Sequence, residues 1–195
     1  AIIASLYATV WAAPAQQVGN ATSTPVTLTL TPGVSGTLTS ADGSVTVTVP
    51  AAAPATAGTL RYTPKTTADA PAVPPTGRAF GSALFDLTVL NATGDPVSSY
   101  SFGSALTISV KYTADDLAAA EGNPSRLGLY RYDTALQSWT SLSTTVDLVT
   151  KAVSARVTRL SFFALMGQAA PATATPTPTA TLIPGRATPT PTVTP

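Results

Sequence analysis

Threonine and aliphatic residues alternate in several short stretches of this chain, and this alternation restricts the local structure more than any other feature. Residues 26–31 read VTLTLT, and residues 44–50 read SVTVTVP. Successive side chains of a strand point to opposite faces, so Val45, Val47 and Val49 share one face and the threonines between them share the other. Threonine is β-branched and favours strands. These stretches therefore predict strands with one buried face.

The same kind of segment recurs along the body of the chain, and turn residues separate the copies. Ala41-Asp42-Gly43 predicts a tight hairpin turn, because glycine can adopt a positive φ. Residues 64–77, rich in Pro, Thr and Ala, predict a long surface loop. One helical signal stands among the strands. It runs TADDLAAAEGN from Thr113, which can cap the helix, to Gly122, which can end it.

Short strands at regular spacing are typical of an all-β fold. We expect an antiparallel β-sandwich of about 8–10 short strands, with one short connector helix and an extended Pro/Thr-rich tail. The chain divides into an apolar N-terminal segment (1–15), a linker (16–25), the sandwich domain (26–167) and a Pro/Thr-rich stalk (168–195).

The N-terminal segment, AIIASLYATVWAAPA, is apolar and uncharged, and it has two interpretations. It resembles the apolar part of a secretory signal, with Ala13-Pro14-Ala15 as a cleavage site before Gln16. Alternatively it is a strand donated to a neighbouring subunit, in which Ile2, Leu6 and Val10 share an apolar face for self-association. The residue types favour the signal interpretation, and the donor-strand interpretation remains an alternative. A spanning helix needs about 20 apolar residues, so we expect no integral membrane span.

The stalk combines proline with dense threonine, which favours an extended, polyproline-like chain. This composition is also typical of O-glycosylated stalks, although unmodified linkers share it. The candidate O-glycosylation positions are the threonines beside Pro176 and Pro178, together with Thr188 and Thr190. Two Asn-x-Thr sequons, at Asn20 and Asn91, are candidates for N-glycosylation.

Composition excludes several classes of function. The 195 residues include no Cys and no His, so no thiolate or imidazole can bind zinc or serve a catalytic triad. Charged residues make up 10% of the chain and the net charge is +1, which gives no basic patch for nucleic acid. We expect no enzyme activity, no metal and no cofactor.

Three stretches carry a resemblance to a known family. GTLTSADGSVTVTVPAAA is similar to the opening hairpin of the sandwich domain shared by zonula-occludens proteins, netrin receptors and ankyrins. LGLYRYDTALQSWTSLSTTVD resembles a later part of that module in bacterial secreted proteins, and RLSFFALMG resembles its closing strand. The resemblance covers about residues 33–167. Pro/Thr-rich tails after such modules are also similar to surface proteins of Chloroflexi-like bacteria.

In some members of that family the closing strand carries His-Phe-Ser and cleaves its own backbone at the serine. The corresponding residues here are Arg159, Leu160 and Ser161. Arginine stays protonated and cannot accept a proton, and general acid–base help is worth about 10²–10⁴ in rate. We therefore expect no self-cleavage, and we interpret Ser161 as a strand residue.

The carboxylates give a weak signal for chemistry. Most of the nine Asp and Glu residues fall in turns or at the helix start, where Asp caps the backbone. Asp86 is the exception, because it lies inside the apolar stretch LFDLTVL. We expect it to face solvent or to pair with Arg61 or Arg78. Calcium at Asp115 and Asp116 or at Asp95 stays open, without a D-x-D-x-D-G loop to support it.

Tyr130, Tyr132 and Trp139 are the candidate ligand-binding residues. The two tyrosines share one strand face, and we expect Trp139 on the next strand, so the three rings could form a sugar-stacking platform. Tyr and Trp also fill sandwich cores and edges, which is the alternative interpretation.

Taken together, these features predict a non-enzymatic, secreted structural subunit on a bacterial cell surface. It would form a filament, sheath or stalk with copies of itself, and sandwich edges can accept a donated strand. The alternative function is an adhesin or carbohydrate-binding module with glycans as partners.

Overall fold

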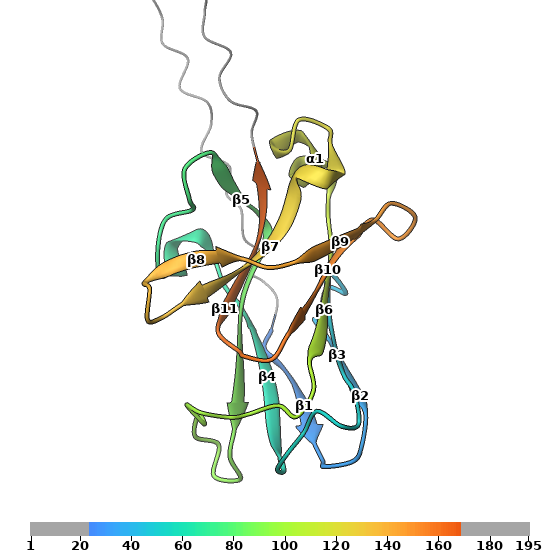
Figure 1. The fold of residues 1–195 in the computed structure, drawn as a ribbon, viewed down its shortest axis with the longest axis vertical. Coiled ribbons are helices and arrows are strands. Elements are labelled where there is room, and N and C mark those ends of the chain that lie inside the picture. Colours follow the sequence, from blue (N-terminus) through green and yellow to red (C-terminus); the bar gives the residue numbers. More distant parts are fainter. Residues whose placement is uncertain (1–23, 169–195) are drawn as a thin grey trace, which may run out of the picture.

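The computed structural model describes residues 24–168; the donor-strand residues Ile2, Leu6 and Val10, Asn20 and the stalk lie outside the described residues. Eleven strands make up this part of the chain, with one short α-helix and two single 3-10 turns (Figure 1). The strands are β1 (Val26–Leu30), β2 (Gly36–Thr39), β3 (Val45–Val49), β4 (Gly58–Pro64), β5 (Arg78–Leu90), β6 (Leu106–Lys111), β7 (Leu127–Asp133), β8 (Ser138–Ser141), β9 (Thr144–Asp147), β10 (Ala152–Val157) and β11 (Phe162–Gln168).

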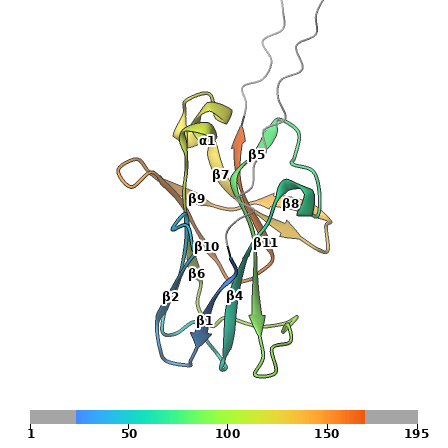
Figure 2. The same cartoon turned by 180° about the vertical axis from the view of Figure 1, so that it is seen from behind.

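Two antiparallel sheets confirm the predicted all-β sandwich. The first has the order β1-β4-β5-β11-β7-β8, and the second has the order β2-β3-β6-β10-β9. The chain crosses between the sheets at both sides, because β1 and β2 are consecutive edge strands and so are β8 and β9. The β9–β10 hairpin projects from the body of the molecule (Figure 2). Four strands therefore have one side without a partner strand.

The apolar side chains on the inner faces of the strands fill the space between the two sheets. Val45, Val47 and Val49 are buried while Thr48 is exposed, as the pattern predicts. Phe85 stacks on Phe163 across the two central strands β5 and β11, with ring centroids 5.7 Å apart. Both rings are fully buried, and they join the aliphatic side chains of the second sheet in one core.

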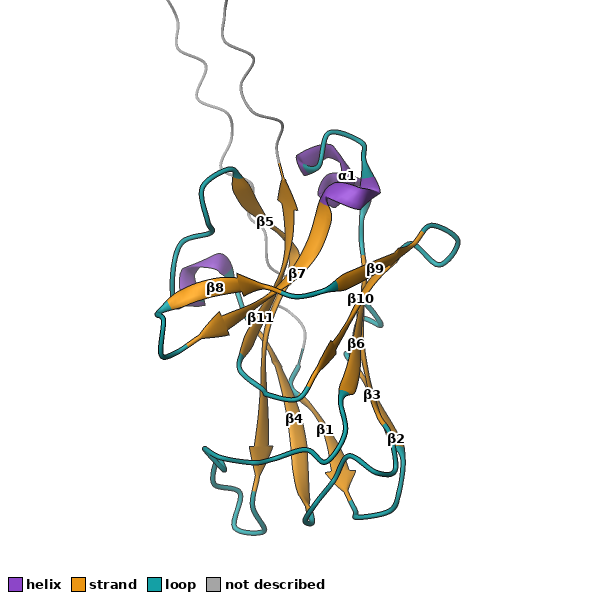
Figure 3. Ribbon diagram, viewed as in Figure 1, coloured by secondary structure: helices purple, strands orange, loops and turns teal. Residues whose placement is uncertain are grey.

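A smaller apolar cluster lies on the opposite, outer face of the six-stranded sheet. It consists of Leu84, Tyr130, Trp139, Ala164 and Met166. These residues alternate with core residues along their strands, which places them on the outer face. The predicted long loop after β4 covers this cluster with Ala70 and Ala72, and it contains the 3-10 turn Thr67–Asp69 (Figure 3).

The single α-helix, α1 (Ala114–Ala119), begins and ends where the sequence indicates. Thr113 caps it by accepting a hydrogen bond from the backbone N–H of Asp116 at 3.2 Å. Gly122 follows with a φ of 74°, a left-handed conformation that glycine adopts without strain. The helix packs against β5 and β11, so it covers one end of the sandwich (Figure 1).

Candidate functional site

The predicted aromatic site does come together, but two of its three rings are buried. Tyr132 pairs with Trp139 across β7 and β8, with ring centroids 5.6 Å apart at 67°. Only 5% of Tyr130 and 7% of Trp139 are exposed. The Trp139 indole Nε1–H donates a hydrogen bond to the carbonyl of Ala72 at 2.9 Å. The geometry favours the packing interpretation for Tyr130 and Trp139, and sugar binding by these two residues stays a prediction.

Two cationic side chains lie over aromatic rings on this outer face. The Arg78 guanidinium lies 5.5 Å from the Tyr130 ring centre, and the Lys65 ammonium lies 5.6 Å from the ring centre of Phe162. Cation–π contacts of this kind hold long side chains over aromatic faces. Tyr132 and Phe162, like Phe80, are half-buried rings that pack against this cluster, so part of each ring is open to solvent.

A groove lies beside Tyr132 and Phe162. Its volume is about 910 Å³, and four chain segments line it: residues 86–89 of β5, the loop 96–102, residues 131–135 at the end of β7, and residues 158–162 before and into β11. The groove combines half-buried rings, serine and threonine hydroxyls, and four charged side chains. This mixture of an aromatic wall and a few oriented polar groups is typical of ligand sites.

The charged residues of the groove are two arginines and two aspartates. Arg131 and Asp133 form an ion pair at 3.4 Å in which both side chains are mostly buried. Backbone N–H groups of Leu136 and Ala135 also donate to Asp133, and these hydrogen bonds hold its pKa below the ordinary value, with smaller effects from Arg131 and Arg159. Asp133 is therefore an ionised acceptor at neutral pH.

Asp86 does not pair with either arginine that the sequence suggests. Its Oδ2 accepts a hydrogen bond from the Thr88 hydroxyl at 2.5 Å, and within residues 24–168 it takes part in no ion pair. It lies directly opposite Phe162 on β11, on the outer face of the sheet, and it lines the groove. Of the two expectations, the solvent-facing one agrees with this position.

Ser161, Leu160 and Arg159, the residues that match the self-cleaving motif, also line the groove. The Ser161 carbonyl accepts a hydrogen bond from the backbone N–H of Leu87 at 3.1 Å, so the residue continues the pairing of β11 with β5. Ser161 is half-buried and Arg159 is exposed. The groove therefore offers the serine two arginines and no neutral base.

Asp116 has a role that the sequence does not reveal. The sequence places it only at the start of the helix, but its carboxylate is buried. Asp116 is 2% exposed, and it accepts hydrogen bonds from the backbone N–H and hydroxyl of both Ser82 and Thr113. Four donors occupy its oxygens, so they are not free to bind calcium. Among the described residues, no group of three or more carboxylates could hold a metal ion.

Asn91 is the one glycosylation candidate that falls in the described part of the chain. It is exposed in the turn after β5, and its Oδ1 accepts hydrogen bonds from the N–H groups of Thr93 and Asp95 and from the Thr93 hydroxyl. This Asx turn confirms the turn role of Asn91. Its glycosylation stays a prediction.

No family model and no curated protein matches the chain. The resemblance of residues 33–167 to the sandwich domain of zonula-occludens proteins, netrin receptors and ankyrins therefore stays a prediction. None of the helices in residues 24–168 is long and apolar enough to cross a bilayer.

Proposed function

We propose that this protein is a non-enzymatic structural subunit of an extracellular bacterial surface assembly, which polymerises when the N-terminal segment of one copy adds as a strand to the sandwich of the next. The observation that carries the proposal is the unpartnered side of β1. Within residues 24–168 this strand pairs with β4 alone and borders no other strand of its sheet. Its free side offers backbone donors and acceptors to an added strand.

The composition of β1 supports its role as the acceptor. Protein edges are commonly protected by charges, proline or short length. β1 reads VTLTL, with five residues and no charge, whereas the edge strand β9 has four residues and ends in Asp147. Thr27 and Thr29 of β1 are exposed. The edge therefore lacks the features that prevent pairing with another chain.

The surface next to this edge also suits contact between copies. Thr37, Thr39 and Thr48 on β2 and β3 are exposed, and β1 and β2 lie beside each other. A surface of threonine hydroxyls without charges brings no electrostatic repulsion between identical subunits. The donor segment, with Ile2, Leu6 and Val10 on one face, has the alternation that an added strand requires.

Secretion and the surface location belong to the same proposal. The Pro/Thr-rich stalk supports them. In this proposal residues 1–15 are the donor strand and are not removed as a signal. The groove charges serve as binding or structural groups in this account.

The experiment compares oligomer size by light scattering for three forms of the chain. We expect the full chain to form oligomers, and we expect the chain without residues 1–25 to remain monomeric. Thr27→Lys and Thr29→Lys, which place a charge on the β1 edge, should also prevent assembly. Thr145→Lys on the β9 edge is the matched control and should assemble normally. Equal assembly of all forms would contradict the proposal.

A further inference from the structure

The groove beside β5 and the segment before β11 has no role in strand exchange, and its lining residues define one kind of ligand. It lies between β5, the loop 96–102, the end of β7 and the segment 158–162. In the sheet order β4 separates the β1 edge from β5, the nearest strand that lines the groove. A ligand in the groove would therefore leave the proposed acceptor edge free.

Half-buried aromatic rings form the apolar part of the groove. Asp86 lies opposite Phe162 on the neighbouring strand, and the pairing of Phe163 with Arg131 brings Phe162 beside Tyr132 on the same outer face. Both rings line the groove and both are partly exposed. Aromatic rings of this kind bind the C–H faces of a ligand while their edges remain wet.

The polar part of the groove holds fixed hydrogen-bonding groups. Asp86 is oriented by the Thr88 hydroxyl, and Asp133 is oriented by Arg131 and two backbone N–H groups. Exposed hydroxyls surround them; these belong to Ser98, Ser99, Ser101, Thr134 and Thr158. Oriented carboxylates and guanidinium groups accept from and donate to adjacent hydroxyls of a ligand at the same time.

The charges of the lining determine the charge of the ligand. The two arginines, Arg131 and Arg159, balance the two aspartates, Asp86 and Asp133, so the lining is formally neutral. A site for phosphate or carboxylate groups would need an excess of positive charge. A ligand with many hydroxyls, a C–H face and no net charge fits all three features of the groove.

We propose that the groove binds a neutral oligosaccharide. The ring faces of Phe162 and Tyr132 contact sugar C–H groups, Asp86 accepts from sugar hydroxyls, and the Arg159 guanidinium donates to them. Asp133, whose pKa is lowered by backbone hydrogen bonds from Leu136 and Ala135, serves as an ionised hydrogen-bond acceptor. This site shares only Tyr132 with the aromatic site that the sequence predicts.

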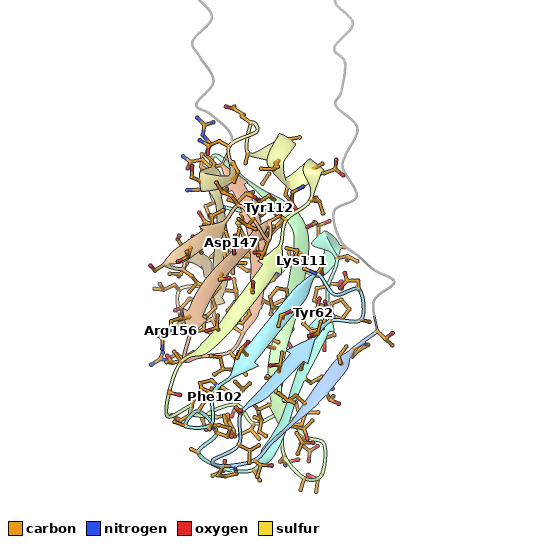
Figure 4. All side chains as sticks on the ribbon, turned by 90° about the vertical axis from the view of Figure 1, so that its right-hand side faces the viewer. Tyr62, Phe102, Lys111, Tyr112, Asp147 and Arg156 are labelled. Atoms are coloured by element: carbon orange, nitrogen blue, oxygen red, sulfur yellow. The ribbon has the colours of Figure 1, made fainter. Side chains whose placement is uncertain are left out.

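The test measures binding of the full chain to a panel of immobilised neutral oligosaccharides, namely glucans, mannans, galactans and N-acetylglucosamine oligomers, beside acidic uronic-acid and sialylated ones. The best neutral ligand is then titrated by calorimetry. Arg159→Ala and Asp86→Asn should each weaken binding by about tenfold or more, because each removes a charge-assisted hydrogen bond. Arg156→Ala is the matched control: this exposed arginine lies on β10 outside the groove and points away from the body (Figure 4).

Three results would overturn the proposal: no neutral oligosaccharide binds, acidic oligosaccharides bind better, or the two groove variants bind as tightly as the control. Circular dichroism spectra of the variants identify any loss that comes from misfolding. Arg159 is exposed, so its replacement removes no buried contact and keeps the test informative if Asp86→Asn fails to fold. A negative result in this binding experiment would not contradict the proposed assembly, because assembly is measured separately as oligomer size.

Discussion

Ser82 donates two hydrogen bonds to the buried carboxylate of Asp116, one from its backbone N–H at 2.6 Å and one from its hydroxyl at 2.7 Å. Thr113 donates two more to the same side chain, at 2.7 and 2.9 Å. The two donor residues lie on different elements, β5 and the start of α1. A single carboxylate therefore fastens the helix to the six-stranded sheet.

Replacement of this carboxylate should be costly. We expect Asp116→Ala to lower the free energy of unfolding by about 3 kcal/mol, because it removes the charged acceptor of four hydrogen bonds from partly buried donors. Asp115→Ala is the control, since Asp115 is exposed one residue earlier in the same helix turn. It should change stability by less than about 0.5 kcal/mol. Urea unfolding measures both variants, and equal stabilities would refute the fastening role of Asp116.

The Trp139 indole should hold the long loop after β4 in place. Trp139→Phe removes the hydrogen bond to Ala72 and keeps an aromatic ring in the cluster. We expect a loss of about 1 kcal/mol and faster proteolytic cleavage within residues 66–77. Trp11→Phe, in the N-terminal segment, serves as the control. Unchanged cleavage of the loop in the Trp139 variant would show that packing alone holds it.

The chain should not cleave itself at Ser161. The groove supplies arginines and no neutral base at this position. Freshly purified protein should therefore give no pair of fragments divided at Ser161 on a denaturing gel or by intact mass. Such a pair, abolished by Ser161→Ala, would show that proton transfer proceeds without histidine.

Acid should destabilise the fold through aspartates in turns. The backbone N–H of Thr150, with further hydrogen bonds from the Thr150 hydroxyl and the Val149 N–H, lowers the pKa of Asp147 below its ordinary value of 3.8. The unfolded chain then takes up protons at a higher pH than the folded chain. The stabilisation is therefore complete above about pH 5 and falls as the pH drops below 4.

Thermal unfolding between pH 7 and pH 2.5 measures this dependence. We expect the midpoint to fall on the acid side, and we expect Asp147→Asn to make that fall shallower. The hydrogen bond of Thr66 lowers the pKa of Asp69 in the same direction, so part of the fall should persist in the variant. A midpoint that rises as the pH falls from 5 to 3 would contradict the assignment.

Local patterns in the sequence predict most of the strand positions. Alternation places Val26–Leu30 and Val45–Val49 correctly, and the positive φ of Gly43 confirms the predicted hairpin turn. These features depend on neighbours within a few residues, so a single sequence reveals them. The cap at Thr113 is local in the same sense.

Features that depend on distant residues are the ones that the sequence does not reveal. β5 begins at Arg78, well before the apolar stretch LFDLTVL, because residues 78–80 pair with the end of β11 beyond an irregularity in register. β9 ends at Asp147, because Asp147 accepts from the N–H groups of Val149 and Thr150 and turns the chain.

The candidate sites also depend on contacts between distant residues, which the sequence does not reveal. The pairing of Tyr132 with Trp139 could be anticipated from their strands, but their cover by the loop after β4 could not, because a hydrogen bond between residues 67 positions apart decides it. The groove combines four segments that are remote in sequence. The sequence singled out Asp86, Tyr132 and residues 159–161 separately, but it gave no sign that they share one groove.

Disulfide trapping tests the central claim most directly, because the chain contains no cysteine of its own. Copies carrying Ser5→Cys, Ala8→Cys or Thr9→Cys are mixed with copies carrying Thr27→Cys or Thr29→Cys under mild oxidation. Addition of the N-terminal segment to the β1 edge predicts a disulfide-linked dimer of the two variants for at least one donor position, and none with Thr145→Cys on β9. Linkage that is absent from every β1 pair, or equal with the β9 control, would contradict assembly by strand donation.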